Sequence, residues 1–199
     1  MDKIIKHREP REFKTTIRHT AECAFQRAII QGKKSIVKEE VINWIDIELP
    51  VDGSNSPRGK CIDLIGKDSH GNYVLCELKF RKTGDNGKPS EAVKQLKEYY
   101  QYIKDNVTEL SNLRHTNATE DINWKKVVSP KTRLMVVANT FYWDTWLIRS
   151  INKENLNDFD NIEFYEVKID RREFEKQKGN KDQYTPKMPK EGINWEERR

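Results

Sequence analysis

The segment RGKCIDLIGKDSHGNYVLCELKF, residues 58–80, decides the fold because two short apolar runs flank a turn sequence. Residues 61–66 and 73–80 have the composition of buried strands, and residues 67–72 combine Asp, Ser, Gly and Asn, which favour a tight turn. A hairpin is therefore predicted. Because side chains alternate along a strand, Glu77 and Lys79 project from one face, and pairing can bring Asp63 beside Glu77.

These three side chains indicate a catalytic site. Burying charges in apolar strands costs several kcal/mol unless they pair with one another or bind an ion. Two carboxylates are ligands suited to Mg²⁺ or Mn²⁺. A lysine one strand step away could orient a water molecule or stabilise negative charge on a phosphate.

A second interpretation is a solvent-exposed sheet face on which Glu77 and Lys79 are ordinary surface residues. Glu-x-Lys alone is a weak signal, since it also occurs at residues 12–14 and 166–168. Neither of those has an aspartate on a preceding hairpin strand together with a following amphipathic helix. The context of residues 77–79 therefore favours the catalytic interpretation.

The remaining patterns predict an α/β fold, a mixed sheet with helices on its faces. Apolar residues at three- and four-residue steps predict a helix over 12–31, with Glu22 and Gln26 beside the apolar stripe and His19 one turn before Glu22. Strands are expected at 41–49, 133–139 and 162–169, and helices at 91–103 and 141–151. We expect a single domain over 1–170, an insertion at 105–131, and a basic, extended or partly ordered tail at 171–199.

These features resemble the PD-(D/E)XK nuclease superfamily, whose fold is restriction-endonuclease-like. Asp63, thirteen intervening residues and then Glu77-Leu78-Lys79 look like its active-site signature, although position 62 is isoleucine rather than proline. Gln95 and Tyr99 resemble the Gln-x-x-x-Tyr motif of the RecB-like branch. The predicted order α-β-β-β-α-β is also that of the superfamily core. The resemblance covers roughly residues 12–140.

The resemblance implies a role for each matching residue. Asp63 and Glu77 would bind Mg²⁺, with Mn²⁺ as a substitute, and Glu22 would be a further ligand, with His19 as an alternative to it. Lys79 would position the attacking water. Gln95 and Tyr99, one helical turn apart, would hold the lysine, the water or a phosphate.

The implied activity is metal-dependent hydrolysis of DNA phosphodiester bonds, and an endonuclease is expected. The preference for DNA rests on the family alone, and exonuclease action stays open. The alternative is a non-catalytic nucleic-acid-binding or protein-interaction module on the same fold. A homodimer or a partner subunit is also left open.

The charge distribution agrees with a polyanionic substrate. The 199 residues carry a net charge of +5, and residues 57–104 hold ten basic and six acidic residues, an excess of +4. Basic residues around the predicted site are expected to contact the nucleic-acid backbone: Arg58, Lys60, Arg81, Lys82, Lys88, Lys94 and Lys97. No long apolar run or secretory signal is visible and no C-x-x-C pair occurs, so we expect a cytoplasmic protein with no membrane partner.

Overall fold

The computed structural model describes residues 3–5, 26, 29, 34–51, 61–80, 88–115, 120–140, 142–143, 155–168 and 193–198. The elements within these residues follow the chain in this order: β1 (Lys3–Ile5), β2 (Lys34–Val37), β3 (Glu40–Pro50), β4 (Cys61–Lys67), β5 (Tyr73–Lys79), α2 (Pro89–Asp105), α3 (Val107–Leu110), β6 (Leu113–His115), α4 (Trp124–Val127), β7 (Arg133–Asn139), a 3-10 turn (Leu156–Asp158), β8 (Ile162–Val167) and β9 (Ile193–Glu197).

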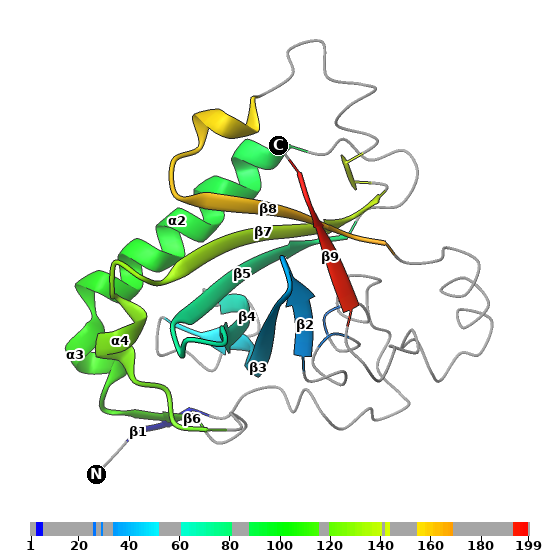
Figure 1. Ribbon diagram of the computed structural model, residues 1–199. Coiled ribbons are helices and arrows are strands. Elements are labelled where there is room, and N and C mark those ends of the chain that lie inside the picture. Colours follow the sequence, from blue (N-terminus) through cyan, green and yellow to red (C-terminus); the bar gives the residue numbers. More distant parts are fainter. Residues whose placement is uncertain are drawn as a thin grey trace, which may run out of the picture.

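Seven of these strands form a closed barrel in the order β2-β3-β4-β5-β7-β8-β9 (Figure 1). The pairs β5–β7, β7–β8 and β2–β9 are parallel, and the other neighbours are antiparallel. Helix α2 packs against β5 and β7 (Figure 1). Strands β1 and β6 pair separately as a small parallel sheet. The carboxyl ends of β5, β7 and β8 therefore meet at one edge of the barrel wall.

The expected mixed sheet with helices on its faces, in the order α-β-β-β-α-β, differs from the structure in two respects. Strand β2 adds a fourth strand before α2, and β9 closes the sheet by joining β8 to β2. Trp195 of β9 packs across the closed barrel: it is 5% exposed and stacks on Trp44 of β3 with 5.4 Å between ring centroids. Closure thus removes two large aromatic rings from water. Strand β9 lies within the tail predicted at 171–199.

Both faces of the barrel wall are buried. One core cluster includes Leu75, Val136 and Leu96 of α2, and the other includes Leu78 and Tyr165 on the opposite face of the wall. Strand β5 alternates between the two clusters, so six of its seven residues are buried. A charged residue on β5 is consequently surrounded by apolar side chains and requires a polar partner.

The predicted hairpin is confirmed. Strands β4 and β5 are antiparallel with Leu64 opposite Cys76, and Gly71 adopts a positive φ of 78° in the turn. Asp68 fixes that turn because its Oδ1 accepts hydrogen bonds from the backbone N–H groups of His70 and Asn72, at 3.0 and 2.8 Å. The local sequence therefore sets the register that places the candidate site.

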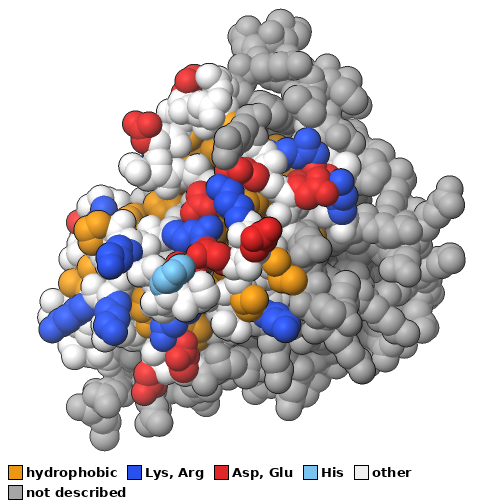
Figure 2. All heavy atoms as spheres, viewed as in Figure 1, with side chains coloured by type: hydrophobic (Ala, Val, Ile, Leu, Met, Phe, Trp, Pro, Cys, Tyr) orange, Lys and Arg blue, Asp and Glu red, His pale blue; other side chains and the backbone are white. Residues whose placement is uncertain are grey.

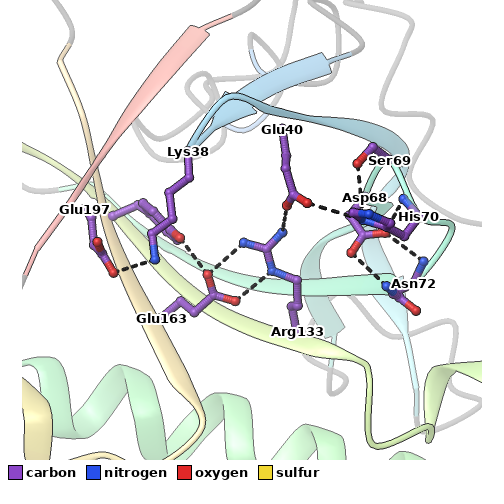
Figure 3. Close-up of polar contacts among 10 residues, drawn as sticks. Lys38, Glu40, Asp68, Ser69, His70, Asn72, Arg133, Glu163 and Glu197 are labelled. Carbon is purple, nitrogen blue, oxygen red and sulfur yellow. Dashed lines mark hydrogen bonds and ion pairs between the residues drawn. The ribbon is translucent and has the colours of Figure 1, made fainter.

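Arg133 and Glu163, near the amino ends of β7 and β8, are the centre of a polar network that we define as Arg133, Glu163, Glu40, Tyr165 and His70. Figure 3 shows Arg133 between Glu163 and Glu40, with His70 beside Glu40. The guanidinium of Arg133 contacts both oxygens of Glu163 at 2.8 Å and Oε2 of Glu40 at 2.7 Å. Acidic and basic side chains gather side by side on this face of the molecule (Figure 2). The network is at the end of the strands opposite Lys79.

The other predicted elements are described only in part. Gln26 and Ile29 are helical and buried, and the rest of the predicted helix 12–31 lies outside the described residues. The stretch 105–131 contains α3, β6 and α4, and its Leu110 and Trp124 pack in the cluster that faces α2. No helix among the described residues is long and apolar enough to cross a membrane.

Candidate active site

Asp63 lies on β4 next to the strand that carries the other two signature residues. The register pairs Leu64 with Cys76, so Asp63 is one step beyond the last pair, on the side of Glu77. Its Oδ2 accepts a hydrogen bond of 2.8 Å from the backbone N–H of Leu78. The carboxylate is thus held against β5, as the hairpin pattern predicts.

Glu77 and Lys79 form an ion pair within the barrel wall. Nζ of Lys79 lies 2.6 Å from Oε1 of Glu77, and the two side chains are 18% and 1% exposed. Such burial excludes the interpretation that this sheet face is an ordinary solvent-exposed surface. A buried charge pair is a costly arrangement that apolar residues could replace with no loss of stability, which favours a functional reason for it.

Helix α2 contributes the next two residues, in the way that the motif spacing predicts. Oε1 of Gln95 accepts a hydrogen bond of 3.3 Å from Nζ of Lys79, and its Nε2 donates one of 3.2 Å to the hydroxyl of Tyr99. An ammonium group has no acceptor, so the amide must present its oxygen to Lys79 and its nitrogen to Tyr99. Glu77, Lys79, Gln95 and Tyr99 therefore form a continuous polar chain from β5 to α2.

The hydroxyl of Tyr99 remains a proton donor near neutral pH. Burial of the side chain raises its pKa above the usual value of 10.0, and the negative charges of Glu77 and Asp63 raise it further, while the bond from Gln95 opposes them. The hydroxyl oxygen accepts from Gln95, so its own hydrogen is available to another group. A phosphate oxygen is an acceptor of the kind this donor could bind.

Gln26 is a site residue that the sequence patterns did not single out. It is 3% exposed, and its Nε2 donates to the backbone oxygen of Asp63 at 3.0 Å and to Oδ1 of Asp63 at 3.2 Å. These bonds connect Gln26 to β4 and orient the Asp63 carboxylate. The available signal was its position beside the apolar stripe, four residues after Glu22.

Several predicted residues cannot be placed in relation to this site. Glu22, His19, Arg58, Lys60, Arg81 and Lys82 lie outside the described residues. Lys88, Lys94 and Lys97 are exposed, and the first two form ion pairs with Glu91 and Glu98 at 3.0 and 3.8 Å. At 100° per residue, Lys97 is turned about 200° around α2 from Gln95. It therefore projects away from the polar chain.

The donor set fits a hard divalent cation. The carboxylate of Asp63 is held in place by hydrogen bonds from Gln26 to Oδ1 and from the backbone N–H of Leu78 to Oδ2, and carboxylate oxygens are ligands that such cations prefer. Glu77 supplies a second carboxylate on the adjacent strand. Within the part of the chain that the structure describes, no group of three or more His, Cys, Asp or Glu side chains is placed to hold a metal. Two carboxylates are the ligands at hand.

Residues 55–125 are similar to a domain of one class of enzyme, the endonucleases. A family model described as "Endonuclease NucS C-terminal domain" matches residues 55–125, a span that contains Asp63, Glu77, Lys79, Gln95 and Tyr99. This stretch of the chain is therefore similar to the C-terminal domain of endonuclease NucS. No match is found among curated proteins.

Two solved structures show a weak likeness. One is described as "crystal structure of a repair endonuclease from Pyrococcus abyssi", with 20% identity and a TM-score of 0.34 over 64% of this chain and 38% of that chain. The other is "Structure of EndoMS-dsDNA2 complex", with 16% identity and a TM-score of 0.38 over 79% of this chain and 48% of that chain. This chain thus spans less than half the length of either.

Proposed function

We propose that the protein is a metal-dependent nuclease that hydrolyses phosphodiester bonds of DNA. The observation that carries the proposal is the buried Glu77–Lys79 ion pair beside Asp63, extended by Gln95 and Tyr99. The match of residues 55–125 to an endonuclease domain supports it. DNA as the substrate and endonuclease action follow from that similarity and from the family resemblance.

Asp63 and Glu77 would hold Mg²⁺ or Mn²⁺, and Glu22 would be a further ligand. When bound, the ion would neutralise charge on the phosphate and lower the pKa of a bound water. Gln26 would keep the Asp63 carboxylate in the orientation needed for binding, because one of its N–H groups already satisfies Oδ1. Positioning residues of this kind are conserved features of metal sites in general and affect metal affinity without contacting the ion.

Lys79 would hold the attacking water or a non-bridging phosphate oxygen. Its ammonium group is held by Glu77 on one side and by Gln95 on the other, which fixes its position before substrate binds. A donor held in place before the reaction stabilises charge at no cost in reorganisation. Tyr99, protonated at neutral pH, would donate to the same phosphate.

The finer parts of the proposal are the RecB-like branch and the DNA-contacting surface. The branch rests on Gln95 and Tyr99, which share one face of α2 and are joined by a hydrogen bond. Arg58, Lys60, Arg81, Lys82, Lys88, Lys94 and Lys97 would contact the DNA backbone. A homodimer or a partner subunit, and a cytoplasmic location, stay predictions.

The test is cleavage of single-stranded, duplex, branched and circular DNA, and of RNA, in Mg²⁺ and in Mn²⁺. We expect cleavage of at least one DNA by the wild type, its loss in EDTA, and a drop of at least about a hundredfold in Asp63→Asn and Lys79→Met. Glu163→Gln, which changes a paired carboxylate at the opposite end of the strands, is the matched control and should keep activity. Binding of DNA with no cleavage under any condition would instead indicate the non-catalytic module.

A further inference from the structure

A second polar cluster lies on the same row of the barrel wall as Lys79. The parallel register places Lys79 of β5 opposite Ala138 of β7, and Ala138 opposite Glu166 of β8. Residues paired in this way point to one face, here the face covered by α2, because Ala138 and Phe164 both belong to that core cluster. Neighbouring strands are about 4.8 Å apart, so the Glu166 backbone is roughly 10 Å from that of Lys79.

Glu166 is a fully buried carboxylate with two partners. It is 0% exposed, and its Oε1 accepts a hydrogen bond of 2.6 Å from the hydroxyl of Thr140, the residue that follows β7. Its Oε2 forms an ion pair with the guanidinium of Arg198, which follows β9. The backbone N–H of Arg198 also donates to the carbonyl of Phe164 at 2.8 Å. Arg198 is therefore anchored through both its backbone and its side chain.

The cation of this pair faces solvent, whereas the anion does not. The side chain of Arg198 is 32% exposed, and that of Glu166 is 0% exposed. Among the described residues, Glu166 is the one carboxylate that pairs with Arg198, through Nη2, and Nε of Arg198 is buried. A guanidinium has five N–H donors, four of them on the two terminal nitrogens, so the exposed end of the anchored group can bind a further anion.

Arg133 shows the contrasting arrangement. It lies opposite Val74, five strand residues or about 16 Å from Lys79, and its guanidinium contacts two carboxylates (Figure 3). Its side chain is 18% exposed. Among the described residues, Arg133 at the far end of the strands is thus held by two carboxylates, whereas Arg198, near the row of Lys79, pairs with one carboxylate and is more exposed.

We propose that Arg198, anchored by Glu166, is a phosphate-binding residue that contacts the DNA backbone beside the cleaved bond. This inference rests on the proposed nuclease function. The separation of roughly 10 Å between the backbones of Lys79 and Glu166, the residue that anchors Arg198, corresponds to about three nucleotide steps of 3.4 Å along one strand. Anchoring reduces the conformational entropy that a flexible arginine would lose on binding, and guanidinium groups bind phosphates with two parallel hydrogen bonds.

The first experiment measures the affinity of short duplex DNA for wild type, for Arg198→Gln and for the matched control Arg133→Gln over a range of salt concentrations. Thermal unfolding of each protein shows whether it is folded. Arg198→Gln should bind about tenfold more weakly and lower the slope of log K against log salt by about one. Its kcat with saturating DNA should stay within about threefold of wild type, because a contact away from the reacting atoms affects mainly KM. Arg133→Gln, when folded, should keep the affinity and the slope.

The second experiment needs no variant and covers the case in which Arg198→Gln fails to fold. Wild-type protein is modified with an arginine-selective dicarbonyl reagent, with and without DNA, and the sites are quantified by mass spectrometry. DNA should slow modification of Arg198 at least about fivefold and leave Arg133 unchanged.

Equal modification of Arg198 with and without DNA overturns the inference, as does a folded Arg198→Gln with wild-type affinity and salt slope. In either case, DNA cleavage by the wild type still decides the proposed function separately. A wild type that neither binds nor cleaves DNA overturns both.

Discussion

Nζ of Lys79 lies 2.6 Å from Oε1 of Glu77, and the carboxylate side chain is only 1% exposed. The ammonium group thus offsets the negative charge of a buried carboxylate. Lys79→Met keeps the side-chain length and removes this charge, so the variant should lose about 2–4 kcal/mol of unfolding free energy. Chemical denaturation measures the change.

The same variant reports on the metal. A divalent ion can supply the positive charge that Lys79→Met lacks, so saturating Mg²⁺ should raise the melting temperature of the variant more than that of the wild type. Lys79→Met with Asp63→Asn should lose this response. An identical Mg²⁺ response in wild type, single variant and double variant would contradict a site at Asp63 and Glu77.

Gln26 should affect catalysis through Asp63. Gln26→Leu keeps a similar volume and removes both hydrogen bonds to Asp63, so we expect Mg²⁺ affinity, measured from the metal dependence of the rate, to fall about tenfold. Saturating Mg²⁺ should largely restore the rate. Gln101→Leu, which removes an exposed glutamine bonded to Asp105, is the matched control. A loss of rate that Mg²⁺ does not restore would argue against a role in positioning Asp63.

The raised pKa of Tyr99 can be observed by ultraviolet titration. Because burial raises the pKa of Tyr99 above 10.0, the tyrosinate absorbance in the wild-type minus Tyr99→Phe difference spectrum should reach half of its maximum only above that pH. Tyr99→Phe removes the O–H donor and keeps the ring, so kcat should fall about tenfold with stability nearly unchanged. A kcat equal to wild type would exclude Tyr99 as a donor to the reacting phosphate.

The polar network at the far end of the strands should govern stability in acid. Burial alone would raise the pKa of Glu163, but hydrogen bonds from Arg133 and Tyr165 and the charge of Arg133 hold it below its usual value of 4.5. A carboxylate with a lowered pKa contributes stability that is present above its unfolded pKa and is lost as the pH falls through the folded pKa. Wild type should therefore lose more unfolding free energy than Glu163→Gln between about pH 6 and pH 3.

Urea denaturation across that range measures the difference. Glu109→Gln, on α3 and exposed, should lose the same amount as wild type. A Glu163→Gln profile that parallels the wild type would show that the network does not stabilise the folded state.

The features predicted from the sequence are those set by local pattern. Alternation along a strand and the turn at Asp68–Asn72 bring Asp63, Glu77 and Lys79 together, and helical spacing places Gln95 and Tyr99 on one face. Each of these relations spans few residues, so it is visible as a period or a motif. The chemistry that can be read from the sequence is therefore concentrated in residues 61–99.

The features that were missed depend on contacts between distant parts of the chain. Trp44 and Trp195 are 151 residues apart in the sequence (195 minus 44), and no local signal indicates that they stack and close the barrel. Glu166 belongs to the Glu-x-Lys triplet at residues 166–168, and its ion-pair partner, Arg198, lies 32 residues further along the chain (198 minus 166). Such pairings are decided by tertiary packing, which a single sequence does not encode as a period.

The most direct test of the nuclease proposal is the initial rate of DNA hydrolysis in Mg²⁺. It is measured for wild type, for the site variants Asp63→Asn, Glu77→Gln and Lys79→Met, and for the control Glu163→Gln. Circular dichroism verifies that each protein is folded. The proposal predicts hydrolysis by wild type and Glu163→Gln, and rates at least about a hundredfold lower in the other three. Wild-type rates in folded Asp63→Asn and Lys79→Met would contradict it.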